Sequence, residues 1–140
     1  MVTHLSGNLP REVVKVFETE SQILLAYLFG SKARGTETSK SDIDIAVPLS
    51  EIPGNLLDHY LHLIDKFSKA LGDKVDLIIL NTAPPLLKHQ VIKHGRVIYC
   101  RDEKARVEFE SKAEKEYLDF RIYRERYDKA LLKEVSTWKN

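Results

Sequence analysis

The sequence contains little of what several protein classes require. Cys100 is the only cysteine among 140 residues, which excludes an internal disulfide framework and a multi-cysteine metal knuckle. The apolar run from Ile23 to Phe29 is far shorter than the roughly 18 residues that a membrane-spanning helix needs. The first ten residues lack the basic and apolar regions of a secretion signal. We therefore expect a cytoplasmic protein with no membrane partner.

An excess of charge of one sign is also missing. The chain has 22 Lys and Arg residues against 21 Asp and Glu residues, which gives a formal net charge of +1. Because no overall field attracts a polyanion, we do not expect direct binding to nucleic acid. The hydrophobic content of 43% is enough for one compact core, and the length leaves no room for a separate substrate domain.

Segments typical of strands and helices alternate within about the first hundred residues. Apolar positions at helical spacing predict helices at 11–20, 55–71 and 84–94, with Pro or Gly near several of their ends. Continuous or alternating apolar runs predict strands at 23–29, 41–47, 74–80 and 96–100. This order indicates an α/β or α+β domain over residues 1–100, with a mixed sheet flanked by helices.

The remaining segment, residues 101–140, contains no Gly and no Pro. It carries 11 of the basic and 10 of the acidic residues of the chain, which predicts one long charged helix. Its apolar positions form one stripe, which has to be buried either against the sheet domain or against another chain. The residues of this stripe are Ala113, Tyr117, Phe120, Tyr127, Leu131 and Val135.

A turn and a pair of carboxylates follow one another at close spacing. Gly30 and Ser31 follow the first strand, and after ten further residues Asp42 and Asp44 begin the next one. Gly30 lets the backbone approach a bulky anion closely, and Ser31 offers a hydroxyl and a backbone N–H to a phosphate. Asp42 and Asp44 are two residues apart on a strand, so both carboxylates project from one face.

Carboxylates gathered in this way predict a metal site. Asp42 and Asp44 repel each other unless a cation lies between them, and oxygen ligands of this kind select Mg²⁺. Asp76 is the only polar side chain in the run from 75 to 80, where a buried carboxylate is costly without a metal or a donor. On a neighbouring strand it would complete a two-metal site for displacement at phosphorus and accept a hydroxyl proton. In the alternative interpretation the aspartates cap exposed strand ends, which accounts for Asp42 better than for Asp76.

These motifs resemble those of the polymerase-β-like nucleotidyltransferases: Gly-Ser, ten residues, Asp-x-Asp and a later strand aspartate. The short chain, with its segments at 30–35 and 41–47, is similar to the minimal nucleotidyltransferases, which are antitoxins of the MntA type encoded beside a HEPN-domain ribonuclease toxin. The resemblance covers about residues 11–100 and, more loosely, the C-terminal helix. It implies transfer of AMP from ATP to a tyrosine of the toxin, which neutralises the toxin within a hetero-oligomer.

The resemblance also implies roles for individual residues. Gly30 and Ser31 would bind the nucleotide phosphates, and Arg34 lies in the matching loop, either at a phosphate or in a packing role. Two Mg²⁺ ions would be held by the catalytic aspartates, which are Asp42, Asp44 and Asp76.

Two further functions stay open from the sequence. One is the same chemistry on a small molecule or an RNA end, and the other is a non-catalytic antitoxin that acts by binding alone through the C-terminal helix. The chain has no Arg followed four to six residues later by His, the arrangement that marks the HEPN toxin, so we expect the antitoxin. It also lacks the Gly-Lys-Ser/Thr ending of a P-loop, which excludes a Walker-type NTPase.

Overall fold

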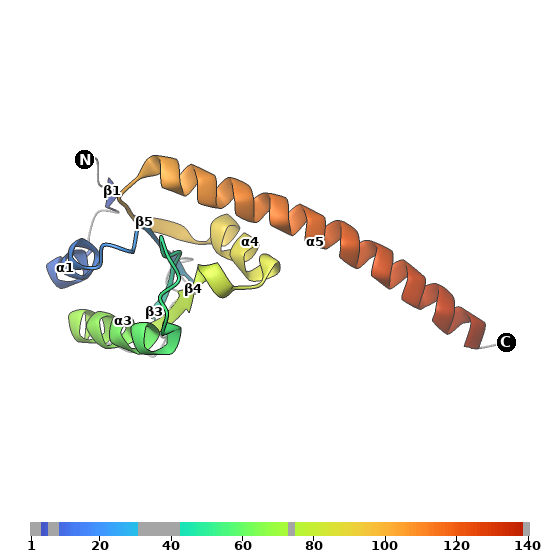
Figure 1. Ribbon diagram of the computed structural model, residues 1–140, viewed down its shortest axis with the longest axis horizontal. Helices are drawn as coiled ribbons and strands as arrows, with labels where there is room; N and C mark the ends of the chain where they lie inside the picture. The colour runs from blue at the N-terminus through green and yellow to red at the C-terminus, as the bar shows by residue number, and fades with distance from the viewer. Residues whose placement is uncertain (1–3, 6–8, 31–42, 73–74, 139–140) are drawn as a thin grey trace.

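A five-stranded mixed sheet forms the centre of the protein. The computed structural model describes residues 4–5, 9–30, 43–72 and 75–138, and its strands follow the order β1-β5-β2-β3-β4 (Figure 1). β3 and β4 are parallel, whereas the other neighbours are antiparallel. The mixed sheet predicted from the sequence is therefore confirmed. The strands are β1 (His4–Leu5), β2 (Leu25–Phe29), β3 (Ile43–Val47), β4 (Val75–Ile79) and β5 (Arg96–Cys100).

The predicted helices are confirmed to within a few residues. Asn55 caps α3 by accepting a hydrogen bond from the backbone N–H of Asp58 at 3.2 Å, and Gly72 ends that helix in a left-handed conformation. The structure adds β1 and a short 3₁₀ turn at Leu80–Thr82, which the sequence did not predict. The α-helices are α1 (Arg11–Thr19), α3 (Leu56–Leu71), α4 (Pro85–His94) and α5 (Glu103–Trp138).

The sheet has a core on each face. On one face α1 and α3 cover the strands, and the ring of Phe17 stacks on that of Tyr99 with centroids 4.5 Å apart. On the other face α4 and the first turns of α5 cover a smaller core built around Tyr27, Ala46 and Val91. Because side chains alternate along a strand, each strand from β2 to β5 contributes to both cores.

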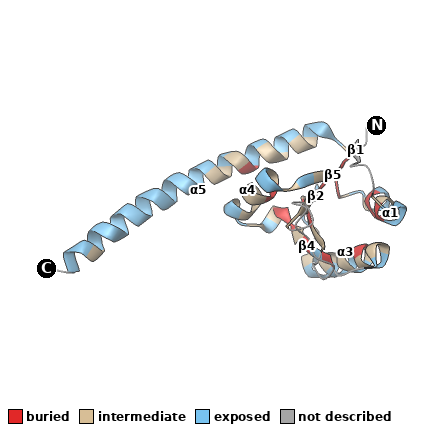
Figure 2. Cartoon of the chain, turned by 180° about the vertical axis from the view of Figure 1, so that it is seen from behind, coloured by how far each residue is buried: buried red, intermediate tan, exposed pale blue. Residues whose placement is uncertain are grey.

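Only the first half of α5 packs against this second core. Ala113 is 2% exposed, and the ring of Tyr117 stacks on that of His89 at 3.8 Å. Tyr27 donates a hydrogen bond of 2.8 Å to Glu110, and burial together with this bond raises the pKa of Tyr27. Beyond this contact the helix projects away from the domain, and residues 121–134 are all exposed (Figure 2). The predicted stripe is thus buried against the domain along the first half of the helix only.

Among the helices that the structure describes, none is both long enough and apolar enough to cross a bilayer.

Candidate functional site

Gly30, Asp44 and Asp76 meet at one end of the sheet, which we call the carboxylate end. Asp44 is the register partner of Phe29 on β2 and of Asp76 on β4. Neighbouring strands lie about 4.8 Å apart, and partners in register point to the same face. The two carboxylates therefore start from adjacent positions on one face of the sheet, as the sequence analysis required of the strand that carries Asp76.

The packing shows which face this is. Ile43 and Ile45, which flank Asp44 on β3, belong to the core under α1 and α3. Ala46, two residues after Asp44, belongs to the core under α4 and α5, and Ile78 stands in the same relation to Asp76. By alternation, Asp44 and Asp76 lie on the face that α4 and α5 cover, at the point where β3 and β4 begin.

Gly30 is held close to Asp44 by the turn that follows β2. Its φ is +81°, a conformation that residues with a Cβ rarely adopt. A Cβ placed there would overlap the Oδ2 atom of Asp44 and approach its Cγ to 3.2 Å. Both the backbone angle and the neighbouring carboxylate therefore require glycine, and the backbone at Gly30 is in direct contact with the predicted metal-binding side chain.

The expectation that Asp76 is buried is wrong. Its side chain is exposed, because β4 is an edge strand of the described sheet and α3 covers only its other face, through Val75 and Leu77. The cost of burying a lone carboxylate therefore does not arise. What supports a role for Asp76 is its register opposite Asp44.

The other predicted site residues, Ser31, Arg34 and Asp42, lie outside the described residues. Within the described parts of the chain, no group of three or more His, Cys, Asp or Glu side chains could hold a metal ion. Asp44 and Asp76 nevertheless supply two neighbouring hard oxygen donors, the type that Mg²⁺ prefers, and they fit that ion as part of a larger set. The predicted third ligand is Asp42.

A cavity of about 210 Å³ adjoins the carboxylate end beside Gly30. Phe29 and Leu87 form apolar walls, and Gln90 and His94 of α4 add an amide and an imidazole. This cavity could not be predicted from the sequence, because no local motif links α4 to Gly30. The signal that could have found it is the sheet order, which places the last turn of α4 over the end of β2.

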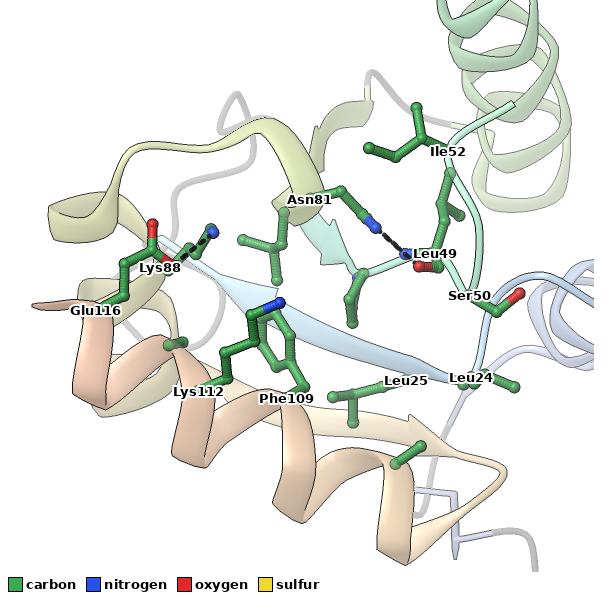
Figure 3. A pocket seen from close by; sticks show the side chains of 14 residues that line it. Leu24, Leu25, Leu49, Ser50, Ile52, Asn81, Lys88, Phe109, Lys112 and Glu116 are labelled. Atoms are coloured by element: carbon green, nitrogen blue, oxygen red, sulfur yellow. Dashed lines mark hydrogen bonds and ion pairs between the residues drawn. The ribbon is translucent and has the colours of Figure 1, made fainter. Parts of the chain in front are cut away.

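A larger cavity of about 320 Å³ starts where β3 and β4 end and β2 begins, which we call the closed end, and extends along α5 as far as Glu116. Asn81 there donates a hydrogen bond of 2.8 Å to the carbonyl of Leu49 and accepts one of 2.7 Å from its N–H (Figure 3). Lys88 and Glu116 form an ion pair of 3.2 Å at the rim, while Phe109 lines the cavity from α5. Of the predicted site residues that the structure describes, Gly30, Asp44 and Asp76, none lines this cavity.

Comparisons with known proteins agree with the geometry. The protein adenylyltransferase MntA of Shewanella oneidensis is 37% identical over 78 residues, which are 56% of this chain and 55% of that protein. The chain thus matches about half the length of this curated relative.

Two crystal structures resemble the protein over most of its length. One is a toxin-antitoxin with AMP-PNP, with a TM-score of 0.73, 27% identity, and coverage of 89% of this chain and 99% of that chain. The other is a tri-AMPylated HEPN toxin of Shewanella oneidensis in complex with its MNT antitoxin, with a TM-score of 0.68 and 25% identity, covering 88% and 95% of the two chains.

The family is given by a match to the model described as polymerase beta nucleotidyltransferase, over residues 11–104. This range contains Gly30, Asp44 and Asp76 and every strand from β2 to β5. Since the match covers more than half of the 140 residues, the chain belongs to the polymerase β nucleotidyltransferase family.

Proposed function

We propose that this chain is an Mg²⁺-dependent protein adenylyltransferase. It transfers AMP from ATP to a tyrosine hydroxyl of a cognate HEPN-type ribonuclease toxin and thereby neutralises that toxin. The observation that carries the proposal is the register of Asp44 and Asp76 beside Gly30, in a chain of this family.

The known proteins support the choice of nucleotide and acceptor. The relative from Shewanella oneidensis is named a protein adenylyltransferase, one similar structure contains AMP-PNP, and another contains a HEPN toxin that carries AMP groups. For this chain we therefore propose ATP as the nucleotide and a protein as the acceptor.

The acceptor oxygen attacks the α-phosphorus of ATP, the bond from that phosphorus to the bridging oxygen breaks, and pyrophosphate leaves. Asp42, Asp44 and Asp76 would hold Mg²⁺, which when bound neutralises charge that develops on the phosphates. Asp76 takes the hydroxyl proton, and its exposure on an edge strand lets an acceptor reach it from solvent. Gly30 allows the phosphates to approach the backbone.

The test is an AMP-transfer assay with the product of the adjacent gene. The protein is incubated with this product, ATP and Mg²⁺, and the product is analysed by mass spectrometry and for ribonuclease activity. We expect an AMP adduct and a loss of ribonuclease activity, both prevented by EDTA. In Asp44→Asn the rate of transfer should fall about 1,000-fold, because an interaction with the reacting phosphates is lost.

A matched control is Asp65→Asn, which removes an exposed carboxylate on α3 that pairs with Lys69 in the same helix. Its transfer rate should equal that of the wild type. The proposal fails if no adduct forms, or if Asp44→Asn transfers AMP as fast as the wild type. Neutralisation by Asp44→Asn without any adduct would indicate an antitoxin that acts by binding alone.

A further inference from the structure

The face by which α5 packs on the domain continues beyond the domain. Residues three or four positions apart lie on the same face of a helix. Residues at this spacing after Tyr117 therefore extend the face that contains Ala113. In the projecting half, residues 118–138, three of them are well exposed: Tyr127 at 56%, Leu131 at 42% and Trp138 at 71%. We call Phe120, Tyr127, Leu131 and Trp138 the inner face.

The direction of α5 places this inner face at the carboxylate end. Near its start the helix lines the same cavity as Leu25 with Ala105, and further on Glu110 accepts the hydrogen bond from Tyr27. The helix therefore runs alongside β2, from the first residues of that strand toward its last (Figure 3). A helix rises about 1.5 Å per residue and a strand about 3.3 Å per residue. Starting from the contact of Glu110 with Tyr27, the helix therefore passes the end of β2 near Tyr117.

The projecting half therefore stands beyond the carboxylate end, on the side of the sheet that carries Asp44 and Asp76. Its 21 residues extend about 32 Å past Tyr117. A macromolecule that lies along the inner face is in contact distance of the carboxylate end, whereas one bound to the opposite face of the helix points away from it.

The composition of the inner face is that of a protein-binding surface. Phe120, Tyr127 and Trp138 are aromatic anchors of the kind enriched in the centres of interfaces, and Leu131 adds an aliphatic one. Arg124 and Asp128 form an ion pair of 3.8 Å within the same helix. Unpartnered apolar side chains in this number on a charged helix mark an interaction site.

We propose that the acceptor protein of the reaction docks on the inner face of the projecting half of α5, which holds its acceptor side chain at the carboxylate end. This inference rests on the proposed function. The surface of the acceptor protein that docks here is apolar and accepts the aromatic side chains of the inner face. The similar structure with AMP-PNP, a toxin-antitoxin, covers 89% of this chain, more than the first 117 residues supply, so its match extends into the projecting half.

The experiment compares two double variants on opposite faces of one helix. Tyr127→Ala/Leu131→Ser alters the inner face, and Leu118→Ser/Ile122→Ala alters the outer face at equal spacing and with similar exposure. The partner is the product of the adjacent gene. We measure its affinity by calorimetry, AMP transfer by mass spectrometry, and ATP affinity of the chain alone.

The inner-face variant should bind the partner about 30-fold more weakly and transfer AMP with a correspondingly raised KM for the partner. The outer-face variant should stay within about threefold of wild type, and both should bind ATP normally and keep their helix content. Equal effects of the two variants, or no effect of either, would overturn the docking site. A self-associated chain that only the inner-face variant dissociates would show that a second copy occupies the face.

Failure of the proposed function is visible separately. If the wild type binds the partner through the inner face but transfers no AMP, the reaction is wrong and the docking site stands. If it transfers AMP equally well in both variants, the reaction stands and the docking site is wrong. A wild type that does not bind the partner overturns the docking site as well.

Discussion

The two ends of the sheet use polar side chains in opposite ways. At the closed end, the side-chain amide of Asn81 makes two hydrogen bonds to the backbone of Leu49, both shorter than 3 Å. At the carboxylate end, the register of β3 and β4 sets Asp44 beside Asp76, two groups of like charge. Like charges side by side do not by themselves stabilise a fold, and the metal site proposed above would account for this arrangement.

The same comparison shows that cavity size does not identify the site. The larger cavity lies at the closed end, where its polar lining includes Asn81, bound to Leu49, and the ion pair of Lys88 and Glu116. The smaller one adjoins Gly30 and the carboxylates. Substitutions at the carboxylate end should therefore change activity, and substitutions at the closed end should change stability.

Among the substitutions that leave the carboxylates themselves in place, the largest effect is expected for Gly30→Ala. The new Cβ would displace the carboxylate of Asp44, and a misplacement of about 1 Å at a catalytic group costs about 100-fold in rate. The left-handed backbone adds a loss of about 1–2 kcal/mol in the free energy of unfolding. AMP transfer and chemical denaturation measure the two effects on the same preparation.

Gly72→Ala is the matched control for this substitution. Its φ of +68° is also left-handed, but no described residue lies within 4 Å of the Cβ position, and Gly72 caps α3. The variant should lose about 1 kcal/mol of stability and keep its transfer rate within about twofold. If Gly30→Ala lost no more activity than Gly72→Ala, close contact with Asp44 would be irrelevant to the reaction.

A smaller effect, on stability alone, is expected for Asn81→Ala at the closed end. The substitution leaves the N–H and the carbonyl of Leu49 without their partners, at a cost of about 1–3 kcal/mol. Denaturation by urea measures this loss, and AMP transfer at 20 °C should stay within about threefold of wild type. A variant of normal stability with greatly reduced transfer would place part of the active site at the closed end.

Local features of the fold could be predicted from the sequence more closely than long-range ones. The extents of α3 and α4 were predicted closely, because a capping Asn55, Gly72 and two prolines mark their ends. The pairing of β1 with β5 was not predicted, since two residues carry no periodicity and the contact spans almost the whole domain. Sheet order is of the same long-range kind.

The candidate site shows the same division. The spacing of Gly30 and Asp44 is local, and the prediction that they belong together agrees with their contact in the structure. The exposure of Asp76 could not be predicted, because an apolar run reads alike in a central strand and in an edge strand that one helix covers. The cavity beside Gly30 depends on where α4 ends in space, which a single sequence does not specify.

A third group of polar contacts links the end of α1 to α3 and, like the hydrogen bonds of Asn81 at the closed end, it serves stability. Glu20, whose side chain is 12% exposed, pairs with Lys66 at 2.6 Å and with His62 at 3.0 Å. Burial by itself raises the pKa of Glu20, but the hydrogen bonds from Lys66 and His62 outweigh it and hold the pKa below 4.5. Its contribution to stability is therefore present above the pKa of the unfolded chain and is lost as the pH falls through the folded value.

The smallest effect is accordingly expected for Glu20→Gln, with a defined dependence on pH. The variant should be about 1 kcal/mol less stable than wild type at pH 7, and the difference should shrink as the pH falls below about 4.5. Asp65→Asn, which breaks the exposed pair with Lys69, should change stability by less than about 0.5 kcal/mol. Urea denaturation at several pH values measures both variants. A loss in Glu20→Gln that is the same at every pH would come from packing, and only a loss that disappears in acid assigns the stability to the charge of Glu20.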